Sequence, residues 1–133
     1  MLGKTGTLTK PETAFSPAAI PGFALWLVGN KSPVTMNGSN VSQCNDISGN
    51  GNHATQGTAT KQPPLGMISG LPAIDFTGDN LDVLSIAATT SINNIWTGGA
   101  YISLVVNFDQ VKDPAEFERF LHKDSASSDG WFL

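Results

Sequence analysis

One block of eight residues constrains the fold more than any other part of the chain. It runs from position 46 to position 53 and consists of Asp46-Ile47-Ser48-Gly49-Asn50-Gly51-Asn52-His53. Asn-Gly pairs accept a positive φ at low cost, and an aspartate in this position accepts backbone N–H groups two and three residues on. The block therefore predicts a tight reversal, with residues 41–46 and 53–56 pairing as antiparallel strands on either side. Alternation places Val41 on one face of its strand and a buried Cys44 on the other.

The composition indicates a chain of many strands and turns. Among 133 residues there are 14 Gly and 8 Pro, and only 14% of the residues are charged, against about 25% in an ordinary soluble domain. Disorder requires low hydrophobicity together with high charge, whereas this chain is 40% hydrophobic with a net charge of −4. We expect a single all-β domain.

Apolar alternation predicts where further strands lie. Residues 23–28 are apolar on both faces, which favours a central strand with Trp26 in the core. Residues 101–108 are the most β-prone run and are also expected in the core. Shorter elements are expected as strands at 67–68, 73–76, 81–86, 117–122 and 130–133, a turn at 70–72, and a helical turn near Ile92, Ile95 and Trp96.

The two ends of the chain differ from the middle. Residues 1–14 are polar and form an N-terminal arm that orders only if a sheet or a partner chain holds it, and residues 15–133 form the β-domain. The sequence stops at the apolar run 131–133, whereas a sandwich often extends to about 200 residues. We expect a domain truncated at its C-terminus, or else one completed by another subunit.

Charge, hydropathy and cysteine content exclude several classes of function. With 7 Lys and Arg against 11 Asp and Glu, the chain has no cationic patch for nucleic acid. The longest apolar run, residues 20–28, is too short to span a bilayer, and the first fifteen residues contain no signal peptide. Cys44 is the only cysteine, so neither an internal disulfide nor a Cys-His zinc site is expected.

Four blocks occur together in a familiar order. They are Pro21-Gly22-Phe23-Ala24-Leu25-Trp26-Leu27, residues 41–56, Gln62-Pro63-Pro64, and residues 70–81. In this order they resemble the laminin-G-like branch of the concanavalin A-like lectin/glucanase superfamily, which is common in bacteriophage tail and head-surface structures and in bacterial surface proteins. The resemblance covers about residue 15 to the C-terminus.

The resemblance implies a jelly-roll sandwich of two antiparallel sheets, with a concave face or rim loops available to a glycan. It also implies that roughly the last third of the domain is missing from this sequence. One position departs from the family pattern, because Cys44 stands where such proteins usually have Trp. A role for this position in stacking on a sugar is correspondingly weakened.

No catalytic residues are expected. Retaining glycosidases need two carboxylates about 5–5.5 Å apart, and residues i and i+2 of one strand would supply them. Glu116-Phe117-Glu118 alone approaches this pattern, and a solvated hairpin tip explains it better. His53 and His122 have no nucleophile and acidic partner in a recognisable triad arrangement.

Two kinds of binding site are implied by the family resemblance, each beside a simpler explanation. A rim calcium site would use oxygen ligands from Asp79, Asn80 and Asp82, close to Asp75, although an Asx-type turn also explains these residues. A glycan site needs exposed aromatic rings and planar polar side chains. Its candidates are Trp96, Tyr101, Asn50, Asn52 and His53, although core packing and a plain turn are the alternatives.

The sequence leads to three functional hypotheses. The first is a non-enzymatic structural protein of a bacteriophage virion, a tail, fibre or capsid-surface component that adheres through weak, multivalent glycan contacts. Its partners would be other virion subunits or copies of itself, and a host-surface glycan; virions leave cells by lysis and need no signal peptide. The alternatives are a purely structural decoration or cement module without a ligand, and the carbohydrate-binding part of a larger glycan-degrading enzyme.

Overall fold

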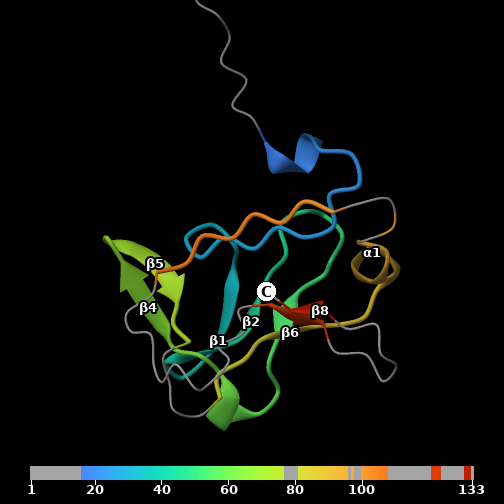
Figure 1. Cartoon of the computed structure of the whole chain (residues 1–133). Coiled ribbons are helices and arrows are strands. Elements are labelled where there is room, and N and C mark those ends of the chain that lie inside the picture. The colour runs from blue at the N-terminus through green and yellow to red at the C-terminus, as the bar shows by residue number, and fades with distance from the viewer. Residues whose placement is uncertain are drawn as a thin grey trace, which may run out of the picture. The chain divides into compact units, whose positions relative to one another are not determined.

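The computed structural model describes residues 16–76, 81–95, 97, 100–107, 121–123 and 131–132. These residues form mostly antiparallel strands with very little helix, so the predicted all-β class is confirmed (Figure 1). In chain order the elements are η1 (Pro17–Ala19), β1 (Val34–Asn37), β2 (Asn40–Cys44), β3 (Ala54–Thr55), η2 (Ala59–Lys61), β4 (Leu65–Ile68), β5 (Leu71–Ile74), β6 (Ser85–Ile86), α1 (Thr90–Asn93), β7 (His122–Lys123) and β8 (Trp131–Phe132).

The chain divides into two compact units, Met1–Ile102 and Ser103–Leu133. The first unit contains the elements from η1 to α1. In the second, β7 pairs antiparallel with β8, His122 opposite Phe132 and Lys123 opposite Trp131. The strand predicted at 130–133 is thereby confirmed in its middle two residues. The predicted N-terminal arm, residues 1–14, lies outside the described residues.

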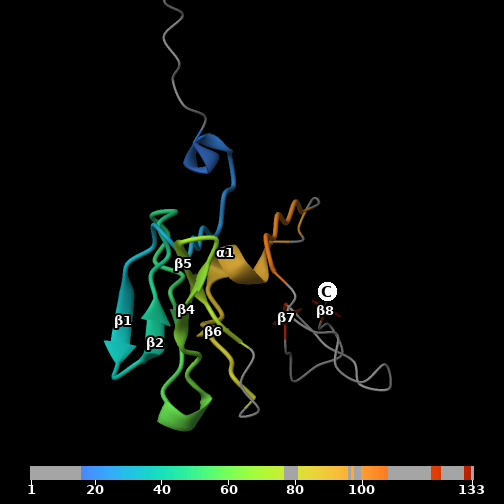
Figure 2. The same cartoon turned by 90° about the vertical axis from the view of Figure 1, so that its left-hand side faces the viewer.

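A four-stranded antiparallel sheet in the order β1-β2-β3-β6 organises the first unit (Figure 2). The predicted reversal is confirmed, because β2 and β3 lie on either side of it with Cys44 opposite Ala54. The pairing continues beyond β3, where the Gln56 N–H donates to the Ser42 carbonyl at 2.9 Å. Residues 46–53, called the rim loop below, therefore connect two neighbouring strands of the sheet.

A β-bulge in β2 changes which side chains are buried. Thr35 lies opposite Gln43, but Met36 lies opposite Val41, so Ser42 is an extra residue on β2. Such an insertion shifts the in–out alternation by one position. Val41 and Cys44 are consequently both buried although they are three residues apart. The expectation that they occupy opposite faces was wrong, because simple alternation assumes a strand without a bulge.

Two hairpins use two-residue turns of the kind that matches strand twist. Between β1 and β2, Gly38 has φ 64°, the arrangement of a type II′ turn. Between β4 and β5, Ser69 and Gly70 have φ values of 50° and 80°, as in a type I′ turn. The turn predicted at 70–72 lies slightly earlier, because Leu71 already pairs with Ile68 in the β4–β5 ladder.

Two runs that were expected to be core strands join no ladder among the described residues. Residues 23–28 form no strand, and the Trp26 N–H donates to the Asp46 side chain rather than to a neighbouring strand. Residues 101–107 are irregular, and Tyr101 and Val105 are 86% and 96% exposed. β-Propensity describes how well a side chain fits a pleated, half-buried surface, so it produces a strand only where a partner strand provides that surface.

The core of the described region is small and unusually polar. Its buried apolar residues are Ala24, Val41, Cys44, Ala54 and Pro63, and its buried polar residues are Ser32, Asp46, Asn52 and Gln62. A buried polar group destabilises the fold unless it is hydrogen-bonded, so these four side chains must be satisfied inside the protein. Among the residues that the structure describes, no helix has the length and apolar character needed to cross a bilayer.

Candidate functional site

The rim loop is built around the carboxylate of Asp46. Its Oδ1 accepts hydrogen bonds from the backbone N–H groups of Trp26 and Ser48, both at 2.9 Å. Its Oδ2 accepts from the Ser48 hydroxyl at 2.7 Å and from the Asn52 N–H at 3.0 Å. One side chain thus fixes both ends of the loop and joins the loop to segment 23–28.

These contacts control the ionisation of Asp46. Burial by itself would raise the pKa of the carboxyl group, because it disfavours the charged form. The hydrogen bonds from Ser48, Trp26 and Asn52 stabilise that charged form, and the resulting pKa lies below the usual value of an aspartate. Asp46 is therefore an ionised structural acceptor near neutral pH rather than a group that exchanges protons.

Asn52 joins the rim loop to two other parts of the unit. Its Nδ2 donates to the Ala24 carbonyl at 2.7 Å and to the Ser91 hydroxyl at 2.9 Å. Its Oδ1 accepts from the Thr89 hydroxyl at 2.7 Å, and Thr89 also caps the start of α1. Asn52 is only 2% exposed, and both of its amide hydrogens are used within the protein. We therefore assign it to the framework of the loop and remove it from the candidate glycan contacts.

The tip of the rim loop is exposed. Gly49 and Gly51 have φ values of 94° and 72°, and these left-handed conformations turn the chain tightly around Asn50. The Asn50 side chain donates through Nδ2 to the carbonyls of Phe23, at 2.7 Å, and Ala24, at 3.3 Å. Its Oδ1 accepts no hydrogen bond from the described residues. Asn50 thus combines a fixed orientation with an oxygen available to a ligand.

His53 ends the loop with one of its two ring nitrogens engaged. The Asp46 backbone N–H donates to Nδ1 at 3.0 Å, so a neutral imidazole carries its proton on Nε2. The side chain is half-buried, and Nε2 makes no hydrogen bond within the described part of the chain. A neutral His53 can therefore donate one hydrogen bond to a ligand.

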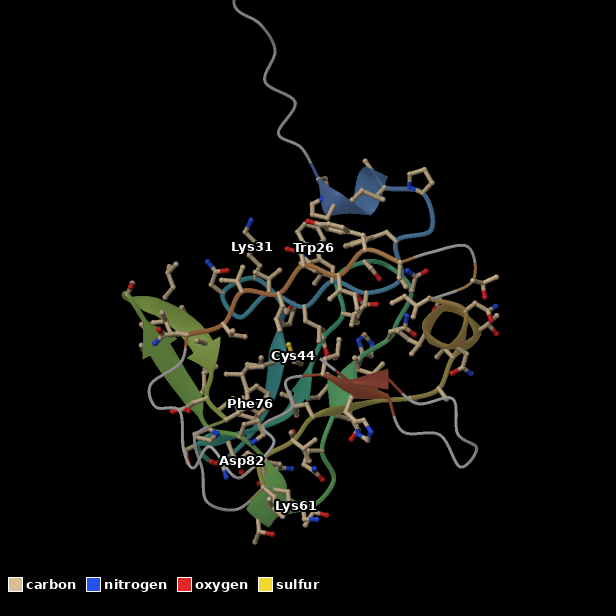
Figure 3. The ribbon with its side chains drawn as sticks, in the orientation of Figure 1. Trp26, Lys31, Cys44, Lys61, Phe76 and Asp82 are labelled. Carbon is tan, nitrogen blue, oxygen red and sulfur yellow. The ribbon has the colours of Figure 1, made fainter. Side chains whose placement is uncertain are left out.

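An aromatic pair adjoins the loop through backbone contacts. The rings of Phe23 and Trp26 have centroids 6.1 Å apart and planes at 65°, an edge-to-face arrangement. Trp26, labelled in Figure 3, was expected in the core, but it is only half-buried. Its backbone binds the rim loop, because its N–H donates to Asp46 and its carbonyl accepts from the Ile47 N–H at 3.0 Å. Phe23, Trp26, Asn50 and His53 are called the rim patch below.

The sequence pattern missed the two aromatic members of this patch. A run of apolar residues such as 23–28 is typical of a buried strand, and the prediction followed this pattern. A local signal indicated otherwise. That signal was Pro21-Gly22 immediately before the run, a turn that is closed by the Phe23 N–H donating to the Ile20 carbonyl at 3.2 Å. Gly22 does have φ 75°, as such a turn requires.

The other predicted site residues are not brought to the rim patch. Tyr101 is highly exposed, and within the described residues no hydrogen bond or ring contact joins it to the rim loop. Asp82 is half-buried and makes no hydrogen bond or ion pair with described residues. Trp96, Asp79 and Asn80, like Glu116 and Glu118, lie outside the described residues.

The part of the chain that is described contains no cluster of side chains suited to hold a metal ion. No group of three or more His, Cys, Asp and Glu side chains gathers there. The oxygens of Asp46, the one carboxylate of the rim loop, are occupied by N–H and O–H donors. The calcium prediction depends on Asp79 and Asn80, and it stays a prediction.

No family model, no curated protein and no solved structure matches this chain.

Proposed function

We propose that this protein is a non-enzymatic structural component of a bacteriophage virion, a tail, fibre or capsid-surface protein whose rim patch contacts a glycan. The observation that carries the proposal is the construction of the rim loop. Asp46 and Asn52 hold the loop from within, and their hydrogen bonds leave Asn50 at an exposed tip beside a half-buried aromatic pair. The resemblance to laminin-G-like domains supports the virion assignment and a jelly-roll sandwich as the fold.

The chemistry of the rim patch suits a neutral sugar. A Trp ring stacks on the apolar face of a pyranose, while planar amide and imidazole groups bond its hydroxyls. Ligands of this kind gain affinity when the protein groups are already fixed, because less conformational entropy is lost on binding. Single-site binding of this kind is weak, and multivalent display on a particle converts it into useful adhesion.

The experiment is a titration of the purified full chain, displayed multivalently on beads, with short neutral oligosaccharides of bacterial surface type. We expect Trp26→Leu to weaken binding by about five- to tenfold, the equivalent of one stacking contact. Phe76→Leu is the matched control, because Phe76 is an aromatic residue that is 52% exposed and lies well away from Trp26 (Figure 3). Thermal unfolding of each variant separates loss of binding from loss of fold.

A second candidate is a structural module that cements neighbouring subunits without a ligand. An exposed apolar hairpin favours it: Met67 is 65% exposed and Leu71 55% exposed, in β4 and β5. If no oligosaccharide binds to the wild-type beads, the glycan proposal fails and this module becomes the better account. The carbohydrate-binding part of a larger glycan-degrading enzyme would bind like the first candidate, but it would belong to a polypeptide with a catalytic carboxylate pair.

A further inference from the structure

The described part of the chain contains two Asn-Gly dipeptides, Asn37-Gly38 in the β1–β2 hairpin turn and Asn50-Gly51 in the rim loop. An asparagine followed by glycine is open to a spontaneous reaction of its own backbone. Because glycine has no Cβ, its backbone nitrogen approaches the side-chain amide carbon of the preceding asparagine with little steric hindrance. Both asparagines are exposed, so sequence and exposure alone do not distinguish them.

The reaction needs no reagent except water. The glycine nitrogen forms a bond to Cγ of the asparagine, the bond from Cγ to Nδ2 breaks, and the nitrogen leaves as ammonia with the proton released by the glycine amide. The product is a cyclic imide. Water then adds to either carbonyl of the ring and opens it to aspartate or to isoaspartate, whose main chain runs through the side chain.

The structure holds the amide of Asn50 away from this reaction. Its Nδ2 donates to three acceptors, the Phe23 carbonyl at 2.7 Å, the Ser48 hydroxyl at 3.1 Å and the Ala24 carbonyl at 3.3 Å. Two of the three are backbone atoms of a neighbouring segment. The side chain must break these contacts before Cγ can rotate toward the Gly51 nitrogen.

Asn37 is held much less firmly. Its Nδ2 donates to one acceptor, the Oε1 atom of Gln62, at 2.9 Å. That acceptor belongs to a side chain and not to the backbone. The attacking nitrogens do not distinguish the two turns, because within the described part of the chain neither the Gly38 N–H nor the Gly51 N–H donates a hydrogen bond. The difference lies in the side-chain amides, since Nδ2 of Asn37 donates to one acceptor and Nδ2 of Asn50 to three.

We propose that Asn37 is the site of spontaneous deamidation in the folded protein and that the contacts of the rim loop protect Asn50. The change has a structural consequence, since Gln62 is 5% exposed and its Nε2 already donates to the Gln56 carbonyl at 2.7 Å. A carboxylate at position 37 leaves Oε1 of Gln62 without its donor. Isoaspartate also lengthens the main chain at the residue that pairs with Asn40.

The test follows both positions in one sample of the full wild-type chain. The protein is incubated at mildly alkaline pH, and each asparagine is monitored by peptide mass spectrometry with electron-transfer fragmentation, which distinguishes isoaspartate from aspartate. A parallel sample is incubated in concentrated urea. The unfolded chain exposes both Asn-Gly pairs equally, so it supplies the intrinsic ratio of their rates.

In the folded protein we expect Asn37 to react at least about fivefold faster than Asn50, the effect of two additional hydrogen bonds at the low end of their usual strength. In urea the two rates should agree within about twofold. The deamidated fraction, separated by its added negative charge, should unfold at lower urea concentration than the unmodified fraction. In Asn37→Gln the fast native reaction should disappear.

Three results would overturn the proposal. The first is a native ratio below about fivefold, including the case in which Asn50 reacts faster. The second is a native chain in which neither position reacts while both react in urea, because folding would then protect both turns. The third is a ratio in urea that already equals the native one, because local sequence and not the fold would then be the cause. The comparison on the wild-type chain does not depend on whether the Asn37→Gln variant folds.

Discussion

Replacing Asp46 by asparagine is the sharpest test of how the rim loop is held together. The Asn side chain has the same shape, and its oxygen can still accept from the N–H groups of Trp26 and Ser48 at the position of Oδ1. Its Nδ2 then occupies the position of Oδ2, where it faces the N–H of Asn52 at 3.0 Å. Two donors meet, and the buried Asn52 N–H is left without an acceptor.

The expected cost follows from these contacts. An unsatisfied buried donor costs about 1–3 kcal/mol, and the remaining bonds lose the additional strength that a charged acceptor gives them. We expect Asp46→Asn to lower the free energy of unfolding by about 2–4 kcal/mol, a large fraction of the roughly 5–15 kcal/mol of a typical domain. Asp82→Asn is the control, expected within about 0.5 kcal/mol of wild type, because Asp82 makes no hydrogen bond or ion pair with described residues.

The assay is urea unfolding followed by circular dichroism and tryptophan fluorescence near neutral pH, with equal m-values required for the comparison. The difference between wild type and variant should also depend on pH. The pKa of Asp46 is lowered in the folded state, so its stabilisation is complete above the ordinary aspartate pKa of about 3.9 and is lost as the pH falls through the lower folded-state pKa. Asp46→Asn has no such titration, so the gap between the two proteins should narrow on acidification. A variant as stable as wild type at neutral pH, or a gap that does not change in acid, would refute this account of the loop.

Three further changes test other parts of the fold. Gly29→Ala should destabilise the protein by about 1–3 kcal/mol, because a Cβ there would lie 2.9 Å from the Pro72 carbonyl oxygen. The control is Gly57→Ala, whose Cβ would meet nothing within 4 Å and which should be neutral or slightly stabilising in the same urea assay. Equal effects of the two substitutions would contradict the close packing at residue 29. Ser69→Asn should stabilise by a few tenths of a kcal/mol, since Ser69 has φ 50° in a type I′ turn and Asn tolerates this conformation better; a lower urea midpoint would count against that turn. Burial raises the pKa of the Cys44 thiol despite its hydrogen bond with the Ser32 side chain, so a thiol reagent at mildly alkaline pH should label the native protein far more slowly than the urea-unfolded protein; equal rates would show that Cys44 is not buried.

The all-β class, the reversal at 46–53 and the pairing on either side of it could be predicted from the sequence because they depend on local chemistry. Glycine and asparagine accept turn conformations whatever surrounds them. Of the two backbone N–H groups expected to donate to Asp46, the one two residues on, in Ser48, does so, whereas the second donor within the loop is Asn52, six residues on rather than three. The same holds for the hairpin around Gly70, which was displaced by about one residue only. Hydrophobic periodicity and turn residues are local features of a sequence, so a single sequence is sufficient to find them.

The tertiary structure alone decided what those local elements contact. The bulge at Ser42 brings Val41 and Cys44 to the same side, and strict alternation gives no sign of it. Segment 23–28 looked like a core strand, yet its backbone binds the Asp46 carboxylate 20 residues away and leaves Trp26 half-buried. Asn52 looked like a surface turn residue, yet its amide joins Ala24 to Ser91 inside the unit. A side chain of given polarity is stable at the surface or in the interior, and which of the two it occupies depends on partners that are distant in sequence. Local patterns therefore predicted the turns of this protein, whereas only the folded chain determined where its site lies.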